Sequence, residues 1–154
     1  MRCVLYSSPV SDFLLKSDGQ ALAECLPWTG AVPDDQPDDI LKMAVGQLDE
    51  YFSGARGLFS VPLAYGDVSP FAKDVYDSLR TVAAGASVTY GQLAAMSGHE
   101  KAARAVGGAM NRNRLLLFVP CHRVLACDGP GGFGCGIEMK IALLDLERRM
   151  YCEN

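Results

Sequence analysis

The sequence predicts an α/β (α+β) fold, with a small N-terminal β-sheet domain that includes one helix, followed by a mostly helical C-terminal domain. Two observations predict it. Residues 4–26 hold short apolar runs separated by turn residues, which is the pattern of a β-meander. Beyond residue 38, apolar positions recur at helical spacing in several separate stretches. The stretch 53–67, with three glycines and a proline, reads as a linker, so we expect domains at 1–65 and 66–154.

Composition excludes several classes of protein. Apolar residues make up 49% and charged residues 21% of the 154 residues, the balance of a folded chain. The longest strictly apolar run, 115–119, is far shorter than the ~20 residues of a membrane span. Residues 1–9 show no signal-peptide core. We therefore expect a cytoplasmic protein that makes no contact with membranes and keeps its six cysteines reduced.

The first helix is expected to follow the loop 28–36. Asp38 and Asp39 open it, because carboxylates suit the positive end of the helix dipole. Six apolar positions then recur at helical spacing: Leu41, Ala44, Val45, Leu48, Tyr51 and Phe52.

Three further helices are expected in the first part of the C-terminal domain. Ser69-Pro70 is a typical helix start, with Ser as N-cap and Pro at the first helical position. Thr89 and Gln92 form a capping box that opens a short helix to residue 97. Another helix is expected from Lys101 to about Met110, and the two short helices make a helix-turn-helix outline.

The end of the chain predicts a strand, a loop and a helix. Residues 115–119 indicate a buried strand that stops at Pro120. The glycine-rich loop 128–136 follows, and then a helix over 137–150. That helix is expected to point four apolar residues and one carboxylate inward: Ile137, Ile141, Leu143, Leu144 and Glu147.

Charge is divided unevenly along the chain. Residues 1–67 carry 4 basic and 10 acidic side chains (−6), and residues 68–154 carry 10 and 8 (+2). Within 90–123, five basic residues stand against one acid, which fits either a solvated basic face or a nucleic-acid contact. Gly107 and Gly108 inside a helix also have two explanations, close packing against another helix or close approach to a nucleic acid.

Cys121, His122 and Glu147 supply the three residue types of a nucleophile, its base and a carboxylate that orients the base. A free thiol has a pKa of about 8.5, so a base must take its proton near neutral pH. Adjacent residues of an extended chain point to opposite sides, so a Cys121–His122 contact requires a bend or a bridging water. The alternative is a structural cysteine beside a core histidine.

The segment 120–124, Pro-Cys-His-Arg-Val, is preceded by 104–110, Arg-Ala-Val-Gly-Gly-Ala-Met, and by Asn113. Together these residues resemble the O6-alkylguanine-DNA alkyltransferases, or methylated-DNA–protein-cysteine S-methyltransferases. The resemblance covers residues 69–150 closely and residues 1–65 loosely.

The resemblance implies a role for each matching residue. Cys121 would accept the alkyl group, His122 would be its water-linked base, and Glu147 would orient His122. Asn113 would tie the second short helix to the active-site turn. Tyr90 would rotate the phosphate of the target nucleotide and protonate the departing guanine.

The resemblance also implies two sets of binding residues. The residues expected to bind DNA are Thr89, Tyr90, Gln92, Ala102, Arg104, Gly107 and Arg123, with Arg104 filling the space that the flipped base leaves. The residues expected to line the substrate pocket are Met110, Val124, Phe133, Gly134, Cys135 and Lys140. The chain departs from the family pattern at Phe133 and Cys135, where tyrosine and glycine are usual, and at Leu116, where some members have proline.

The implied function is repair by direct reversal, in which one molecule transfers one alkyl group to its own Cys121 after base flipping. The expected partner is double-stranded DNA with O6-alkylguanine, and O4-alkylthymine is a second candidate substrate. We expect a monomer with no obligate protein partner, no cofactor and no metal, associated with the nucleoid, or nuclear in a eukaryote. Two alternatives stay open: a non-catalytic lesion-binding relative, which has tryptophan at the position of Cys121, and a helix-turn-helix regulatory protein.

Overall fold

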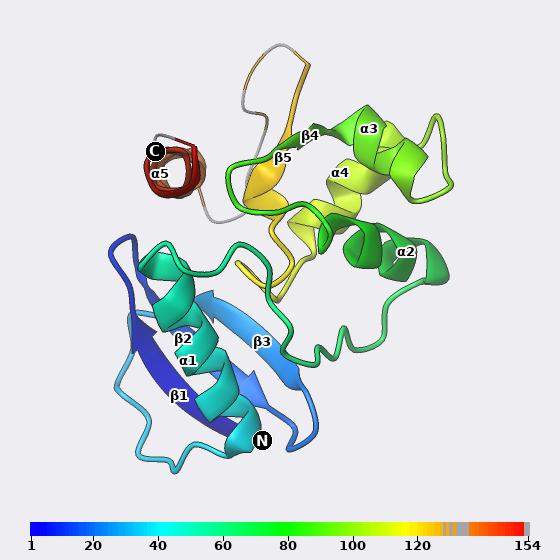
Figure 1. Cartoon of the computed structure of the whole chain (residues 1–154). Helices are drawn as coiled ribbons and strands as arrows, with labels where there is room; N and C mark the ends of the chain where they lie inside the picture. The colour runs from blue at the N-terminus through cyan, green and yellow to red at the C-terminus, as the bar shows by residue number, and fades with distance from the viewer. Residues whose placement is uncertain (128, 130, 132–135, 153–154) are drawn as a thin grey trace.

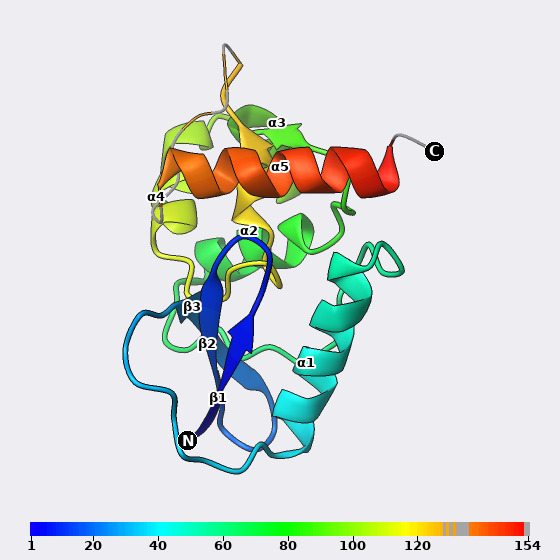
Figure 2. The same cartoon turned by 90° about the vertical axis from the view of Figure 1, so that its left-hand side faces the viewer.

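The computed structural model describes residues 1–127, 129, 131 and 136–152. Three antiparallel strands come first, in the order β1 (Arg2–Ser7), β2 (Asp12–Ser17) and β3 (Leu22–Pro27). This sheet is the predicted meander. Helix α1 (Asp39–Phe52) packs on it, as Figures 1 and 2 show.

Helix α1 forms where its sequence signals place it. The Asp38 carboxylate accepts a hydrogen bond from the Leu41 amide at 2.9 Å, which caps the first turn. Four apolar side chains of α1 are fully buried against the sheet and the segments that follow: Leu41, Ala44, Leu48 and Tyr51.

The C-terminal half is built around helices. They are α2 (Pro70–Leu79), α3 (Tyr90–Met96), α4 (Ala103–Asn111) and α5 (Ile137–Tyr151). Ser69 caps α2, and Thr89 and Gln92 form the predicted capping box of α3. Because Lys101 has a φ of +72°, α4 starts at Ala103, two residues later than expected. Within the part of the chain that the structure describes, no helix is long and apolar enough to cross a membrane.

Two short strands bring the start of α3 beside the reactive segment. Strand β4 (Val88–Thr89) pairs in parallel with β5 (Val124–Leu125), with Val88 opposite Val124. Since Tyr90 follows β4 directly and Cys121 lies just before β5, this pairing places the helix-turn-helix next to the candidate nucleophile. Figure 1 shows β4 beside β5, at the start of α3.

The prediction of a buried strand at 115–119 is wrong. All five residues are buried, but Leu117 has a φ of +73° and the Val119 amide donates to the Leu115 carbonyl at 2.9 Å, so the segment turns. Only Leu115 forms a bridge, to Cys25 of β3. A run of apolar residues indicates that the segment is buried, but a compact turn can be buried as completely as a strand.

The inward face predicted for α5 is confirmed at Leu143 and Glu147 and is wrong at Ile137 and Ile141. Ile137 and Ile141 are 39% and 44% exposed, whereas Lys140, Leu143 and Glu147 are buried. Those three residues are spaced by three and four positions and so share one face of the helix. Helix α5 thus buries two charged side chains, Lys140 and Glu147. Each of them has polar partners inside the protein.

Candidate active site

Cys121, His122 and Arg123 form a single turn of 3-10 helix, η1 (Cys121–Arg123). The Cys121 amide donates to the Val119 carbonyl at 2.7 Å, and the Arg123 amide donates to the Pro120 carbonyl at 2.9 Å. The chain therefore bends at the cysteine, as a Cys–His arrangement requires. Cys121 is 4% exposed, so its side chain lies almost entirely inside the protein.

Asn113 braces this turn from the end of α4. Its side-chain amide donates to the Val119 carbonyl at 2.9 Å, and its side-chain oxygen accepts from the Leu115 amide at 2.9 Å. These two bonds make the tie between the second short helix and the active-site turn that was expected of Asn113. The N-terminal sheet adds a second brace, because Cys25 of β3 exchanges backbone hydrogen bonds with Arg114 and Leu116.

The Glu147 carboxylate is the centre of a buried network. His122 Nε2 lies 2.6 Å from Glu147 Oε2, which brings together the base and the carboxylate predicted from the sequence. Arg123 donates to both carboxylate oxygens, from Nε at 2.9 Å and from Nη2 at 2.8 Å. The Tyr51 hydroxyl donates to Oε2 as well.

Arg123 was expected to contact DNA, and its position corrects that expectation. It is 1% exposed, and its remaining guanidinium nitrogen Nη1 donates to the Val82 carbonyl at 2.7 Å. A guanidinium in this position cannot reach a phosphate. Arg123 is instead the counter-ion of Glu147.

The network sets the protonation states of its members. Burial by itself would raise the pKa of Glu147, but its electrostatic interactions and hydrogen bonds with His122 and Arg123 hold it well below the ordinary value. Burial lowers the pKa of His122, and Arg123 and Lys140 lower it further against the opposing effect of Glu147. At neutral pH the carboxylate is ionised and the imidazole is neutral. Because an ionised carboxylate only accepts, the His122 proton is on Nε2, which leaves Nδ1 as a proton acceptor.

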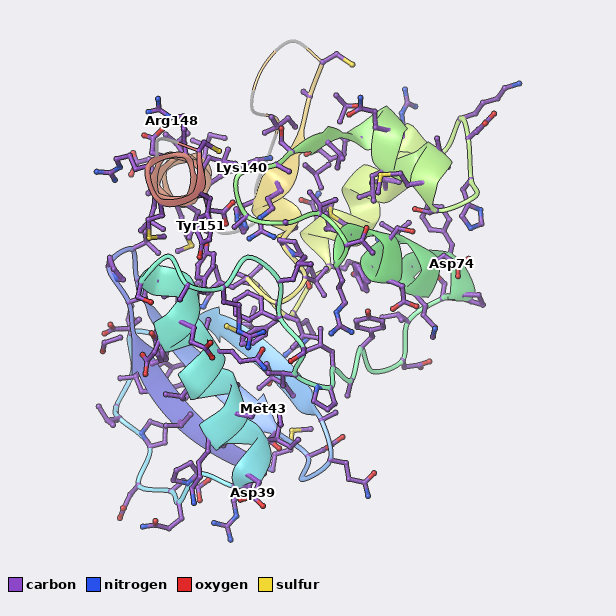
Figure 3. All side chains as sticks on the ribbon, viewed as in Figure 1. Asp39, Met43, Asp74, Lys140, Arg148 and Tyr151 are labelled. Carbon is purple, nitrogen blue, oxygen red and sulfur yellow. The ribbon has the colours of Figure 1, made fainter. Side chains whose placement is uncertain are left out.

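Tyr90, Val124 and Lys140 lie together on one side of the reactive turn. Lys140 donates to the Val124 carbonyl at 2.6 Å, and its Nζ is 6.0 Å from the centre of the Tyr90 ring. Figure 3 shows Lys140 between α5 and β5. A Cβ at Gly131, which has a φ of +75°, would lie 3.0 Å from the Tyr90 hydroxyl, so Gly131 lies close to Tyr90 in a backbone conformation that favours glycine. Three other residues expected in the pocket, Phe133, Gly134 and Cys135, lie outside the described residues.

A cavity of about 720 Å³ opens beside Cys121. Met110 and Leu116, both buried, contribute to its wall, and Asn113 and Arg112 contribute polar groups. The cavity continues toward the segment 65–72 and α2. It offers space next to the thiol for a substituent larger than a methyl group.

The helix-turn-helix presents its small and basic residues outward. Gln92 and Arg104 are exposed, and Thr89, Ala102 and Gly107 are half-buried. A Cβ at Gly107 would reach only ordinary contact with the Tyr90 ring, at 4.0 Å. Packing within the chain therefore does not require glycine at 107, which favours the second explanation, close approach of a partner to α4.

Sequence reasoning missed one member of the network, Tyr51. Its position on the apolar face of α1 was predicted, but its hydroxyl bonds to a carboxylate 96 residues away. Its place on an apolar stripe gave no signal of this polar contact.

This fold and site define a class of protein: a helix-turn-helix unit joined to a buried Cys–His–Glu array and supported by a small N-terminal sheet domain. Two family models match the chain. Residues 70–149 match the DNA binding domain of 6-O-methylguanine DNA methyltransferase, and residues 1–65 match its ribonuclease-like domain. The chain belongs to the 6-O-methylguanine DNA methyltransferase family, which confirms the resemblance found in the sequence.

Relatives and solved structures agree with this membership. A methylated-DNA–protein-cysteine methyltransferase of Methanosarcina acetivorans is 36% identical over 154 residues, covering 96% of this chain and 98% of that protein. The constitutive enzyme of the same name from Bacillus subtilis is 44% identical over 115 residues, covering 73% and 69%. The crystal structure of the Mycobacterium tuberculosis O6-methylguanine methyltransferase has a TM-score of 0.85 at 31% identity, covering 99% and 96%. A structure of the protein OGT from the same organism in complex with DNA has a TM-score of 0.82 at 33% identity, covering 95% and 92%.

Proposed function

We propose that this chain repairs alkylated DNA by moving the alkyl group from O6 of guanine to Sγ of Cys121. The observation that carries the proposal is the 2.6 Å contact of His122 Nε2 with Glu147 beside a buried cysteine. Relatives that match nearly the whole chain are named methylated-DNA–protein-cysteine methyltransferases, and these names support the proposal.

The reaction is a single displacement. His122 takes the thiol proton at Nδ1, through a water molecule, and the Cys121 thiolate attacks the alkyl carbon. The carbon–O6 bond breaks as the sulfur–carbon bond forms, and its electron pair passes to guanine. The Tyr90 hydroxyl then supplies a proton to guanine, and the proton held by His122 passes through solvent to the Tyr90 phenolate, which leaves both side chains neutral. The thioether has no group to reopen it, so each molecule acts once.

The target base must leave the helix stack, because the alkyl carbon cannot meet a buried thiol inside a duplex. Tyr90 and Arg104 carry this step. Tyr90 lies at the start of α3 beside the pocket residues Val124 and Lys140, and Arg104 is exposed on α4. The small residues of α4 allow it to approach the minor groove, where Arg104 takes the place of the extruded base.

We propose that residues 66–154 bind DNA and carry the reaction, and that residues 1–65 support the reactive turn. Duplex DNA with O6-alkylguanine is the partner, bound by a monomer in the cytoplasm, at the nucleoid, or in the nucleus of a eukaryote. O4-alkylthymine is a second substrate, since it presents an alkyl group on the equivalent exocyclic oxygen. No step draws on a metal or cofactor.

Mass spectrometry after mixing with duplex DNA tests the proposal. With O6-methylguanine, the intact chain should gain one methyl group in place of a proton, and peptide mapping should place it on Cys121. Cys121→Ala should bind the same duplex without reacting. An adduct on Cys127 or Cys135, or binding without any adduct, would overturn the proposal, and the second result would favour the lesion-binding alternative. A parallel reaction with O4-methylthymine tests the second substrate.

A further inference from the structure

We propose that Tyr51, on helix α1 of the N-terminal half, is a positioning residue for alkyl transfer. Its hydroxyl holds the Glu147 carboxylate in the state in which His122 is a neutral, correctly oriented base. The inference rests on the proposed function, since it assigns Tyr51 a part in that reaction.

The geometry gives Tyr51 a direct connection to the base. Its hydroxyl donates to Glu147 Oε2, the same oxygen that contacts His122 Nε2 at 2.6 Å. The other oxygen, Oε1, accepts from Arg123 Nε at 2.9 Å and from the Gly85 amide at 3.4 Å. Donors therefore surround the carboxylate, and Tyr51 is the donor that comes from the N-terminal half.

Tyr51 is itself held in place from several sides. The Tyr51 side chain is fully buried, and its ring packs against Phe59 with centroids 5.5 Å apart. The Tyr151 hydroxyl donates to the Tyr51 carbonyl at 2.7 Å and to the Arg56 carbonyl at 2.6 Å. Figure 3 shows Tyr151 between α5 and α1. Tyr151 and Glu147 both lie on α5, so the hydrogen bond from Tyr151 holds Tyr51 of α1 in place relative to Glu147.

The charges around Glu147 give the hydroxyl a consequence for His122. The carboxylate faces Tyr51, His122 and Arg123, while Lys140 adds a further positive charge that acts on His122. Burial raises the pKa of Tyr51, and Glu147 raises it further, so the hydroxyl stays protonated and always donates. Each donor to Oε2 withdraws negative charge from the carboxylate and weakens its attraction for a proton on His122. Without the Tyr51 hydroxyl, that attraction grows and the pKa of His122 rises.

The test replaces the hydroxyl and keeps the ring. In Tyr51→Phe, we expect the limb of the pH–rate profile that rises with pH to move by about half to one pH unit toward alkaline pH, since His122 must be neutral to act. That shift corresponds to a roughly three- to tenfold slower methyl transfer from duplex DNA below the His122 pKa, with recovery at higher pH. The NMR titration of His122 should move in the same direction. Binding of the variant to the duplex should equal that of the parent.

Tyr6→Phe is the matched control, because the Tyr6 hydroxyl also bonds to a carboxylate of α1, Asp49 Oδ1 at 2.8 Å, without touching the site. It should leave the pH profile and the His122 titration unchanged. Tyr151→Phe keeps the Tyr51 hydroxyl but removes its anchor, and we expect a smaller shift in the same direction. This variant serves as the test if Tyr51→Phe does not fold.

A Tyr51→Phe variant with the parent pH profile and the parent His122 titration would overturn the inference, even if its rate falls by the same factor at every pH. The role of Tyr51 would then be limited to packing in the core. The His122 titration needs no alkyl transfer, so it reports on Tyr51 independently. If the parent protein transfers no methyl group at all, the proposed function fails and the titration still decides whether Tyr51 acts on His122.

Discussion

Arg123 and Glu147 form a two-bonded ion pair in which both residues are 1% exposed. Pairing in this geometry satisfies two donors and both carboxylate oxygens, which offsets the cost of burying the charges. Because Arg123 neutralises the carboxylate, Glu147 can orient His122 without holding a proton on it. The arginine of the segment 120–124 therefore acts inside the protein, as the counter-ion of Glu147.

The first prediction concerns this ion pair. Arg123→Ala leaves a buried carboxylate without its counter-ion, so we expect the free energy of unfolding to fall by about 3–5 kcal/mol. Urea unfolding measures it. Arg148→Ala is the control on α5, because Arg148 is exposed and its ion pair with Asp145 spans 3.7 Å. This substitution should change the free energy of unfolding by less than ~0.5 kcal/mol. A loss of similar size in the two variants would contradict the assignment of Arg123 as the counter-ion of Glu147.

The second prediction concerns proton removal from Cys121. His122→Ala and Glu147→Gln should slow methyl transfer by about 10² to 10⁴, with much smaller effects on DNA binding, because general-base help has that magnitude. Raising the pH should partly restore His122→Ala, since hydroxide then ionises the thiol. Single-turnover rates from pH 6 to 9 provide the measurement. A His122→Ala protein that reacts at the parent rate at neutral pH would remove His122 from the mechanism.

The third prediction separates base flipping from chemistry. Arg104→Ala and Tyr90→Phe should slow repair in duplex DNA more than reaction with free O6-benzylguanine, because only the duplex requires a nucleotide to leave the stack, at a cost of a few kcal/mol. Arg104, exposed on α4, should show the larger difference between the two substrates. Comparing inactivation rates with each substrate tests this. Equal losses on both would assign the two residues to the pocket or the fold.

The fourth prediction concerns stability against pH. The pKa of His122 is lowered by burial, and His122 gains a proton on unfolding, so stability is lost as pH falls below the unfolded value of about 6.5. The depressed pKa of Glu147 means that its contribution is complete above the unfolded value of about 4.3 and is lost below it. We therefore expect the free energy of unfolding to decline in two stages between pH 7 and pH 3. Glu147→Gln should make the lower stage shallower, because Asp38 and Asp77, whose pKa values are also lowered, still contribute to it. A curve of unchanged shape in this variant would contradict the assignment.

The elements whose signals are local could be predicted from the amino-acid sequence. The caps at Asp38, Ser69 and Thr89 were predictable because an N-cap side chain bonds to an amide two or three residues ahead. The meander followed from turn residues between short apolar runs. The hypothesis that Cys121, His122 and Glu147 act together followed from their residue types, because thiolate formation requires a base and a group that orients it. The contact between His122 and Glu147 is present in the structure.

The conformation and contacts of each buried segment depend on long-range packing, which the local sequence does not specify. An apolar run such as 115–119 reports burial, and whether it is a strand or a turn depends on the segments around it. The inward face of α5 is set by partners for Lys140 and Glu147 that lie far away in sequence, at Val124, His122 and Arg123. The buried Glu147 carboxylate needs hydrogen-bond donors around it, and Arg123 and Tyr51 supply them. Nothing in the local sequence pattern indicates which distant residues these donors are.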